Sequence, residues 1–271
     1  MKYKNKTPMR ETVGRLTNNW NQLLAFSPLY AVSSPAPDVF WPGCAVMRLG
    51  ADIVGQTYQV LAQALPGLGF SGWCCAKPTF AAGSQGQRLK RERQLSAHFT
   101  GAGIKRLFTL CPNCQTGLAR RADVKTISAW PILAKYAQNN AKPAKNLAGR
   151  YILHDPCAAR GDKAVQEAAR AILTARGVSF AEFVRNGANT RCCGRKDMLF
   201  LTDPAASQKL LRARLDEAGE LPVVSYCESC VEAFRGAGCR SAHLLEIIFD
   251  APAGRSVWNR VKNAHRKDFY A

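Results

Sequence analysis

The chain has 271 residues, of which 47% are apolar and 21% are charged, so its composition is that of a folded globular protein and not of a disordered one. Its formal net charge of +19 is large enough to attract an anionic partner, such as an acidic protein or phospholipid headgroups. No apolar run reaches the roughly 18 residues of a membrane-spanning helix, and no apolar stretch follows the basic start, so we expect a cytoplasmic protein.

Four segments follow one another along the chain. Residues 1–37 are expected to form a basic N-terminal extension that ends in a proline-rich connector, and residues 38–145 a first cysteine-rich module. A second module is expected over residues 146–250, followed by a basic C-terminal tail over 251–271. The polar stretch 139–149 carries no clear apolar period, so we interpret it as the connection between the modules.

The sequence of the first module predicts a strand, a helix and a further strand around its cysteines. A short apolar segment runs into a turn at Cys44, and apolar residues then recur at helical spacing until Pro66 and Gly67 stop the helix. The apolar run 107–110 is typical of a strand and places Cys111 directly after its C-terminal end.

The second module repeats this order. Cys157 follows a short extended segment, and a helical period then ends before Gly177. The apolar run 223–226 leads into Cys227. The offset between corresponding cysteines is nearly constant, which indicates internal duplication. We therefore expect two pseudo-equivalent α/β modules, with the cysteines near the C-terminal ends of strands and near the module interface.

Ten of the eleven cysteines fall into two sets of five with the same pattern: a single cysteine, an adjacent pair and a CxxC pair. The sets are Cys44, Cys74, Cys75, Cys111 and Cys114 in the first module, and Cys157, Cys192, Cys193, Cys227 and Cys230 in the second. A CxxC pair can serve zinc, but a structural zinc site takes four protein ligands and would leave one thiol over in each set. Adjacent cysteines in an extended segment point to opposite sides, which suits a cluster of several irons better than a single ion.

Two other interpretations stay open from the residues alone. The cysteines could form vicinal disulfides or remain buried thiols, although disulfides are rare in cytoplasmic proteins. They could also form four-cysteine zinc sites with spare thiols, in which case the protein would be a zinc-binding scaffold. The remaining cysteine, Cys239, falls outside both sets and is expected to be a buried inert thiol.

The local motifs around the cysteines also carry a resemblance. The sequences FWPGCA at 40–45, CPNC at 111–114 and HDPC at 154–157 resemble the tandem cysteine-rich CCG domains of heterodisulfide reductase and of iron–sulfur subunits of glycolate and lactate oxidation systems. The resemblance covers residues 38–245. Ala76 departs from the glycine that follows the first cysteine pair in the family, and we expect an alanine there to be tolerated only if its φ is negative.

The resemblance implies a function as well as a cofactor. In this family each five-cysteine set binds a noncubane [4Fe-4S] cluster, so all ten cysteines become ligands, with zinc in one module as a variant. We therefore expect an iron–sulfur redox subunit of a multi-protein oxidoreductase, similar to heterodisulfide reductase, that passes electrons to a thiol, disulfide or quinone-linked acceptor. The alternative within redox chemistry is an electron relay for a flavoprotein that oxidises a 2-hydroxyacid such as glycolate or lactate.

Partners are expected because the chain offers no entry point for electrons of its own. No dense CxxCxxC run remains for a ferredoxin-type cluster, and no strand is followed by GxGxxG, so we expect a separate ferredoxin-type iron–sulfur or flavoprotein subunit. Basic residues gather at both ends of the chain, at Lys2, Lys4, Lys6, Arg10 and Arg15, and at Arg255, Arg260, Lys262, Arg266 and Lys267. These ends are either solvated or contact an acidic partner or an anionic membrane surface, and no nucleic-acid-binding motif is present.

Three residues beside the cysteines are candidates for proton transfer or charge stabilisation. His154 and Asp155 precede a cysteine of the second set and could exchange protons with a thiol, but a His-Asp-Pro turn more often satisfies backbone groups. Lys77 follows the first cysteine pair and could stabilise thiolates or an anionic substrate, although a solvated lysine is the more common situation.

Overall fold

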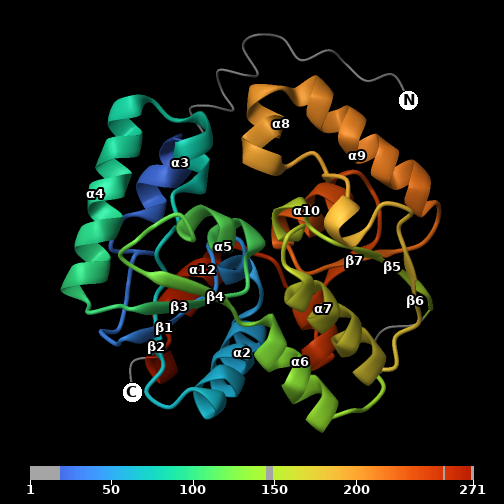
Figure 1. Ribbon diagram of the computed structural model, residues 1–271, viewed down its shortest axis with the longest axis horizontal. Helices are drawn as coiled ribbons and strands as arrows, with labels where there is room; N and C mark the ends of the chain where they lie inside the picture. The colour runs from blue at the N-terminus through green and yellow to red at the C-terminus, as the bar shows by residue number, and fades with distance from the viewer. Residues whose placement is uncertain (1–18, 145–148, 253, 270–271) are drawn as a thin grey trace.

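The computed structural model describes residues 19–144, 149–252 and 254–269, which form two α/β modules lying side by side (Figure 1). Each module is built around a four-stranded sheet with helices packed on it. The elements of the first module are β1 (Asp38–Trp41), the short helix η1 (Val46–Arg48), α2 (Ala51–Ala64), β2 (Gly69–Phe70), α3 (Lys77–Ala82), α4 (Gln85–Gly101), β3 (Arg106–Thr109), α5 (Pro112–Leu118), β4 (Lys125–Ser128) and α6 (Trp130–Asn139).

The second module repeats the arrangement and is followed by a C-terminal segment. Its elements are β5 (Tyr151–His154), η2 (Cys157–Ala159), α7 (Lys163–Ala175), β6 (Phe180–Glu182), η3 (Gly187–Asn189), η4 (Lys196–Met198), α8 (Leu199–Thr202), α9 (Pro204–Ala218), β7 (Val223–Ser225), α10 (Glu228–Gly236), β8 (Ser241–His243) and α11 (Leu244–Phe249). The C-terminal segment contains α12 (Val257–Ala264) and η5 (Lys267–Phe269). The helices predicted after Cys44 and Cys157 are α2 and α7, and the strands predicted before Cys111 and Cys227 are β3 and β7.

The two sheets have the same topology. Their strand orders are β2-β1-β3-β4 and β6-β5-β7-β8, and every pairing between named strands is parallel. The expected α/β class with two similar modules is therefore confirmed. In each sheet the chain first adds a strand on one side and then crosses to the other, so the strand order reverses between β1 and β3 and between β5 and β7. Loops at the carboxyl ends of strands meet at such a reversal, which is where α/β proteins form their binding sites.

The modules share one apolar core. Leu61 of α2, Leu133 of α6 and Ile172 of α7 are fully buried in a cluster that also contains Ile247 of α11. Helices α6 and α7 lie in contact across the boundary between modules. Because burying apolar area stabilises a fold by roughly 25 cal/mol per Å², this shared core fixes one module against the other.

The C-terminal segment folds back onto the first module. Helix α12 contacts η1 and α2, and in Figure 1 it lies behind the first sheet. Phe269 packs its ring 4.3 Å from that of Phe70 and 4.7 Å from that of Tyr58. Among the basic residues of this end, Arg255 is bonded to buried glutamates, whereas Lys262 and Lys267 are exposed.

The N-terminal extension is described only from residue 19 onward. Residues 19–25 are helical, with Trp20 and Leu23 exposed to 63% and 56%. The basic residues predicted at this end, Lys2, Lys4, Lys6, Arg10 and Arg15, lie outside the described residues. Within the described ranges, none of the helices has both the length and the apolar character needed to cross a membrane.

Candidate metal centre

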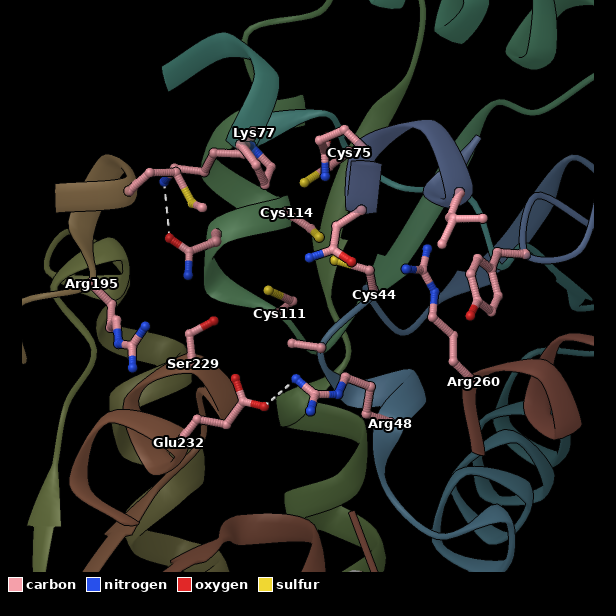
Figure 2. A pocket seen from close by; sticks show the side chains of 18 of the residues that line it. Cys44, Arg48, Cys75, Lys77, Cys111, Cys114, Arg195, Ser229, Glu232 and Arg260 are labelled. Carbon is pink, nitrogen blue, oxygen red and sulfur yellow. Dashed lines mark hydrogen bonds and ion pairs between the residues drawn. The ribbon is translucent and has the colours of Figure 1, made fainter. Parts of the chain in front are cut away.

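The first five-cysteine set gathers where β1, β2 and β3 end. Its thiols lie close enough to shift one another's pKa values through side-chain interactions, in a chain from Cys44 to Cys74, Cys75, Cys114 and Cys111. Figure 2 shows the sulfurs of Cys44, Cys75, Cys111 and Cys114 facing one another at the centre of the pocket. All five sulfurs predicted to act together are therefore brought together.

Gly43 lets the turn after β1 lie close to the turn after β3. Its φ of +89° lies in the region that favours glycine, and a Cβ at this position would come within 2.7 Å of Cys111 Cβ. The turn before Cys44 can therefore lie directly against the CxxC turn that starts α5. The glycine was part of the sequence motif, and the close approach is the reason for it.

Ala76 corrects one expectation from the sequence. It adopts φ +58° and ψ +8°, a left-handed conformation, whereas an alanine was expected to be tolerated here only at a negative φ. Gly194, which follows the second cysteine pair, has φ +87°. Both modules thus have a residue with positive φ after their cysteine pair. For an alanine this conformation is about 1–2 kcal/mol less favourable than the right-handed one.

The second set gathers in the same way where β5, β6 and β7 end. Side-chain interactions that shift the pKa values of the thiols link Cys157 to Cys192, Cys192 to Cys193, and Cys230 to both Cys193 and Cys227. Cys193 Sγ and Cys230 Sγ lie 3.0 Å apart. The backbone N–H of Gly194 also donates to Cys192 Sγ at 3.2 Å.

Each set contains a thiol that is acidified by its neighbours. Hydrogen bonds from Cys114 and then Cys74 lower the pKa of Cys75, although burial acts in the opposite direction. Hydrogen bonds from Cys157 and Cys193 lower the pKa of Cys192 in the same manner. The thiolate is the metal-binding form of cysteine, so these thiols ionise most readily, whereas neighbouring thiols and burial raise the pKa values of Cys44, Cys74, Cys114, Cys157, Cys193 and Cys230.

The two sets lie next to each other across the module boundary. Asn113, within the first CxxC turn, donates from Nδ2 to Cys227 Sγ of the second set at 3.6 Å. Helix α5 contacts η2, and α3 contacts η4, so the cysteine-bearing ends of the modules face each other. This agrees with the expected position of the cysteines near the module interface.

A cavity of about 420 Å³ opens over the first set. Cys44, Cys75, Cys111 and Cys114 form part of its wall, and charged side chains from both modules and from α12 surround them (Figure 2). The cationic residues of this lining are Arg48, Lys77, Arg195 and Arg260. Arg48 is paired with Glu232 at 2.5 Å. The Arg260 guanidinium lies 4.2 Å over the Tyr30 ring, and its Nε and Nη2 have no hydrogen-bond partner among the described residues. The excess of positive charge suits an anionic molecule in contact with the first set.

Both modules match a known family of cysteine-rich domains. A family model described as the cysteine-rich domain, CCG, matches the chain over residues 39–119 and again over 151–235, more than half of its length. The chain belongs to the CCG cysteine-rich domain family. The resemblance inferred from the motifs is therefore confirmed, including its tandem arrangement.

Two further similarities are weaker. A segment of 96 residues of this CCG protein is 32% identical to a protein of Chromohalobacter salexigens described as a probable membrane-anchored ferredoxin, and it covers 34% of this chain but only 14% of that protein. The fold was also matched to glutamate racemase RacE1 from Bacillus anthracis, with a TM-score of 0.29 and 11% identity over 78% of this chain and 77% of the racemase. A likeness at that level carries no argument.

The structure places the two weaker candidates of the second module inside the fold. Asp155 is fully buried and accepts hydrogen bonds from Arg170, Tyr226 and the backbone of Gly187 at 2.8 Å each. Burial alone would raise its pKa, but these donors outweigh burial and lower it. With its acceptor positions occupied, the carboxylate organises the turn before Cys157, as the structural alternative for this residue predicts.

His154 is also fully buried, and burial lowers its pKa to about 3, so the ring is neutral. Lys77 reaches across the module boundary. Its Nζ donates to Asn113 Oδ1 at 3.0 Å and lies 3.6 Å from an oxygen of Asp197, so Lys77 contacts the carbonyl side of the Asn113 amide and not a cysteine.

Cys239 is half-buried, its thiol donates to the backbone oxygen of Arg240 at 3.4 Å, and burial raises its pKa.

Sequence reasoning missed three residues that meet the cysteines. The amide of Gln22 lies 4.0 Å from Cys74 Sγ, Asn113 contacts Cys227, and the charge of Arg260 acts on Cys44 and Cys74. Asn113 could have been found because it stands inside the CPNC motif. Gln22 and Arg260 gave no local signal, since both come from outside the two modules and reach the site only through tertiary folding.

Proposed function

We propose that this CCG protein is an iron–sulfur redox subunit of a multi-protein oxidoreductase, in which each five-cysteine set holds one [4Fe-4S] cluster of the noncubane type. The observation that carries the proposal is the convergence of five cysteines in each of two adjacent sites, repeated by the same fold topology. In each set the adjacent cysteine pair takes part in the same sulfur network as the CxxC pair, as ligands shared by several irons require.

The residues present fit such a cluster better than they fit zinc. A structural zinc site is closed by four ligands, so a fifth buried thiol in hydrogen-bond contact with the others would remain unused in each module. The second site also holds two donors that favour sulfur in its anionic form, namely Gly194 N–H toward Cys192 and Asn113 Nδ2 toward Cys227. Cluster sulfurs are negatively charged and are stabilised by such donors.

The cavity over the first set is where an acceptor would bind. When present, the clusters supply electron storage and transfer. The chain's own contribution is to bind and orient the acceptor, since Arg195 and Arg260 offer positive charge from opposite sides of the pocket (Figure 2). Phe200 and Met198 add an apolar part to the lining. A thiol or disulfide that carries an anionic group, or a quinone-linked acceptor, suits this combination.

Electrons would reach the protein from a ferredoxin-type iron–sulfur or flavoprotein subunit. The similarity to a probable membrane-anchored ferredoxin supports such an environment, although it covers a third of this chain. The formal charge of +19 would favour an acidic carrier or peripheral contact with an anionic membrane.

The decisive experiment is metal analysis of anaerobically purified protein. We expect iron and acid-labile sulfide in near-equal amounts, with about eight irons per chain if both modules are loaded, a brown colour and little zinc. About half that iron would mean that only one module holds a cluster. Stoichiometric zinc with little sulfide would contradict the proposal and support the zinc scaffold instead.

A further inference from the structure

The first strand of each module ends in a residue with a buried ring N–H. Trp41 is the last residue of β1 and His154 the last residue of β5, and each stands three positions before the first cysteine of its set, Cys44 or Cys157. Both side chains are fully buried. Neither Trp41 Nε1 nor His154 Nε2 has a hydrogen-bond partner in the part of the chain that the structure describes. Because a buried donor without an acceptor destabilises the fold, two at equivalent positions indicate a missing acceptor.

The proton of His154 is located on the unpartnered nitrogen. Arg214 Nη2 lies 3.2 Å from His154 Nδ1, and a guanidinium only donates, so Nδ1 accepts this hydrogen bond. A neutral imidazole has one proton, which must then be carried by Nε2. Arg214 is itself held by Glu217 at 3.0 Å and by the backbone oxygen of Arg185 at 3.1 Å, so the ring orientation is fixed from behind.

The His154 ring lies beside two sulfurs of the second set. A ring nitrogen of His154 and the sulfurs of Cys193 and Cys230 lie within 4.8 Å of one another. Since Nδ1 is occupied by Arg214, Nε2 is the nitrogen available to these sulfurs. The same arrangement excludes His154 as a metal ligand, because a protonated Nε2 has no lone pair to give and Nδ1 already accepts a hydrogen bond.

Trp41 has the corresponding place in the first module. It belongs to one buried cluster with Cys75, Cys111 and Cys114, and its ring centroid lies 5.9 Å from that of Phe99. An indole has a single polar group, which only donates. Among the side chains of that cluster, the cysteine sulfurs are the ones able to accept a hydrogen bond.

We propose that His154 and Trp41 are positioning residues that donate ring N–H hydrogen bonds to the sulfurs of the second and the first cluster, respectively. The inference rests on the proposed function, because it needs clusters with anionic sulfur. A hydrogen bond to sulfur withdraws electron density and stabilises the reduced cluster. Each ring therefore raises the reduction potential of its own cluster.

The test compares variants that remove the donor with one that keeps it. His154→Phe and Trp41→Phe retain an aromatic ring without an N–H, whereas His154→Gln keeps an amide N–H that can reach the place of Nε2. We expect His154→Phe to lower the midpoint potential of the second cluster alone and Trp41→Phe that of the first alone, in redox titrations of the holoprotein followed by electron paramagnetic resonance. His154→Gln should keep the wild-type potential. Signals are assigned to modules with Cys74→Ser and Cys192→Ser.

A second measurement detects the contact directly in the wild-type protein. With nitrogen-15 histidine, the reduced second cluster should show a hyperfine coupling to a ring nitrogen that His154→Gln abolishes. Unchanged potentials in both Phe variants at full iron content, or a His154→Gln variant shifted as far as His154→Phe, would overturn the inference and leave the proposed function standing. Wild-type protein that takes up zinc and no iron would overturn both.

Discussion

Asn113 Nδ2 donates to Cys227 Sγ across the module boundary, so the CxxC turn of the first set contacts a cysteine of the second. Lys77 fixes the direction of this contact, because its ammonium occupies Asn113 Oδ1 and leaves the amide N–H side for the sulfur. Lys77 also pairs with Asp197 of the second module. The two sites are therefore coupled through side chains as well as through the shared core.

The contact predicts that a substitution in the first module changes the cluster of the second. Asn113→Ala removes the amide donor that this turn offers to Cys227, so we expect the potential of the second cluster to fall while its iron content stays the same. The potential of each cluster is measured by redox titration in the holoprotein. Gln115→Ala is the matched control, since Gln115 also reaches across the boundary but donates to Asp162, at 2.8 Å, and not to a sulfur. An equal shift in both variants would mean that module docking, and not the amide donor, is responsible.

Loss of one member of an adjacent pair should remove one cluster and leave the other. Cys74→Ser and Cys192→Ser each interrupt the sulfur network of their own module, so we expect about half of the wild-type iron and sulfide in each variant. Lower resistance to proteolysis should accompany the loss, because metal binding contributes folding free energy.

Cys239→Ser is the control for both variants. Its thiol donates to the backbone of Arg240 and takes no part in either sulfur network of the described chain, so iron content should be unchanged. Bleaching by Cys239→Ser, with full iron in the two other variants, would show that the assignment of ligands is wrong.

Much of this architecture follows from local sequence. The helical periods before Pro66 and Gly177 and the apolar runs before Cys111 and Cys227 predicted elements that the structure contains, because each depends on spacing within a few residues. Duplication of the cysteine pattern then predicted two similar modules.

What the sequence could not predict depends on residues far apart in the chain. Gln22 and Arg260 reach the first set from segments interpreted as an extension and a tail, and only the packing of α12 on η1 and α2 brings Arg260 there. The positive φ of Ala76 could not be predicted, because steric preference favours a negative φ while the geometry of the cysteine turn imposes a positive one. Tertiary constraint overrode local preference at the residue next to a ligand.

This turn gives a prediction about the two residues that follow the cysteine pairs. Gly194→Ala combines an unfavourable φ of +87° with a Cβ placed 2.3 Å from the backbone oxygen of Ser207. We therefore expect the free energy of unfolding to fall by about 1–3 kcal/mol and the second module to retain its cluster less well. Ala76→Gly is the reciprocal change. Relief of the strained φ and the greater entropy of the unfolded chain act in opposite directions there, so stability should change by less than about 1 kcal/mol.

Both variants are compared with wild type by denaturant unfolding and by iron content under anaerobic conditions. If Gly194→Ala is tolerated as well as Ala76→Gly, the close approach to Ser207 is relieved by a backbone movement and the two turns are not under the same constraint. If Ala76→Gly removes the first cluster, the methyl group of Ala76 has a packing role that the backbone angle does not explain.

The last prediction concerns stability and pH. His243 is fully buried at the N-terminus of α11, and burial, reinforced by the charge of Arg255, lowers its pKa to about 3. An unfolded chain binds a proton at this imidazole below about pH 6.5, whereas the folded chain does not, so stability that is present above pH 6.5 is lost as the pH falls. One such group lowers the free energy of unfolding by about 2 kcal/mol when the pH falls from about 7.5 to about 5. His154 and His98, with pKa values lowered by burial to about 3 and about 4, act in the same direction.

His243→Asn isolates this contribution. Asparagine can replace the ring as the acceptor for Leu245 N–H, which His243 Nδ1 bonds at 3.3 Å, and it does not titrate. We expect the variant to lose some stability at every pH because the ring leaves a gap, but to show a shallower fall between pH 7.5 and pH 5 in urea unfolding. His265→Asn, at an exposed position, controls for the replacement of a histidine as such. A parallel profile for His243→Asn would instead mean that the buried ring of His243 becomes protonated in the folded protein.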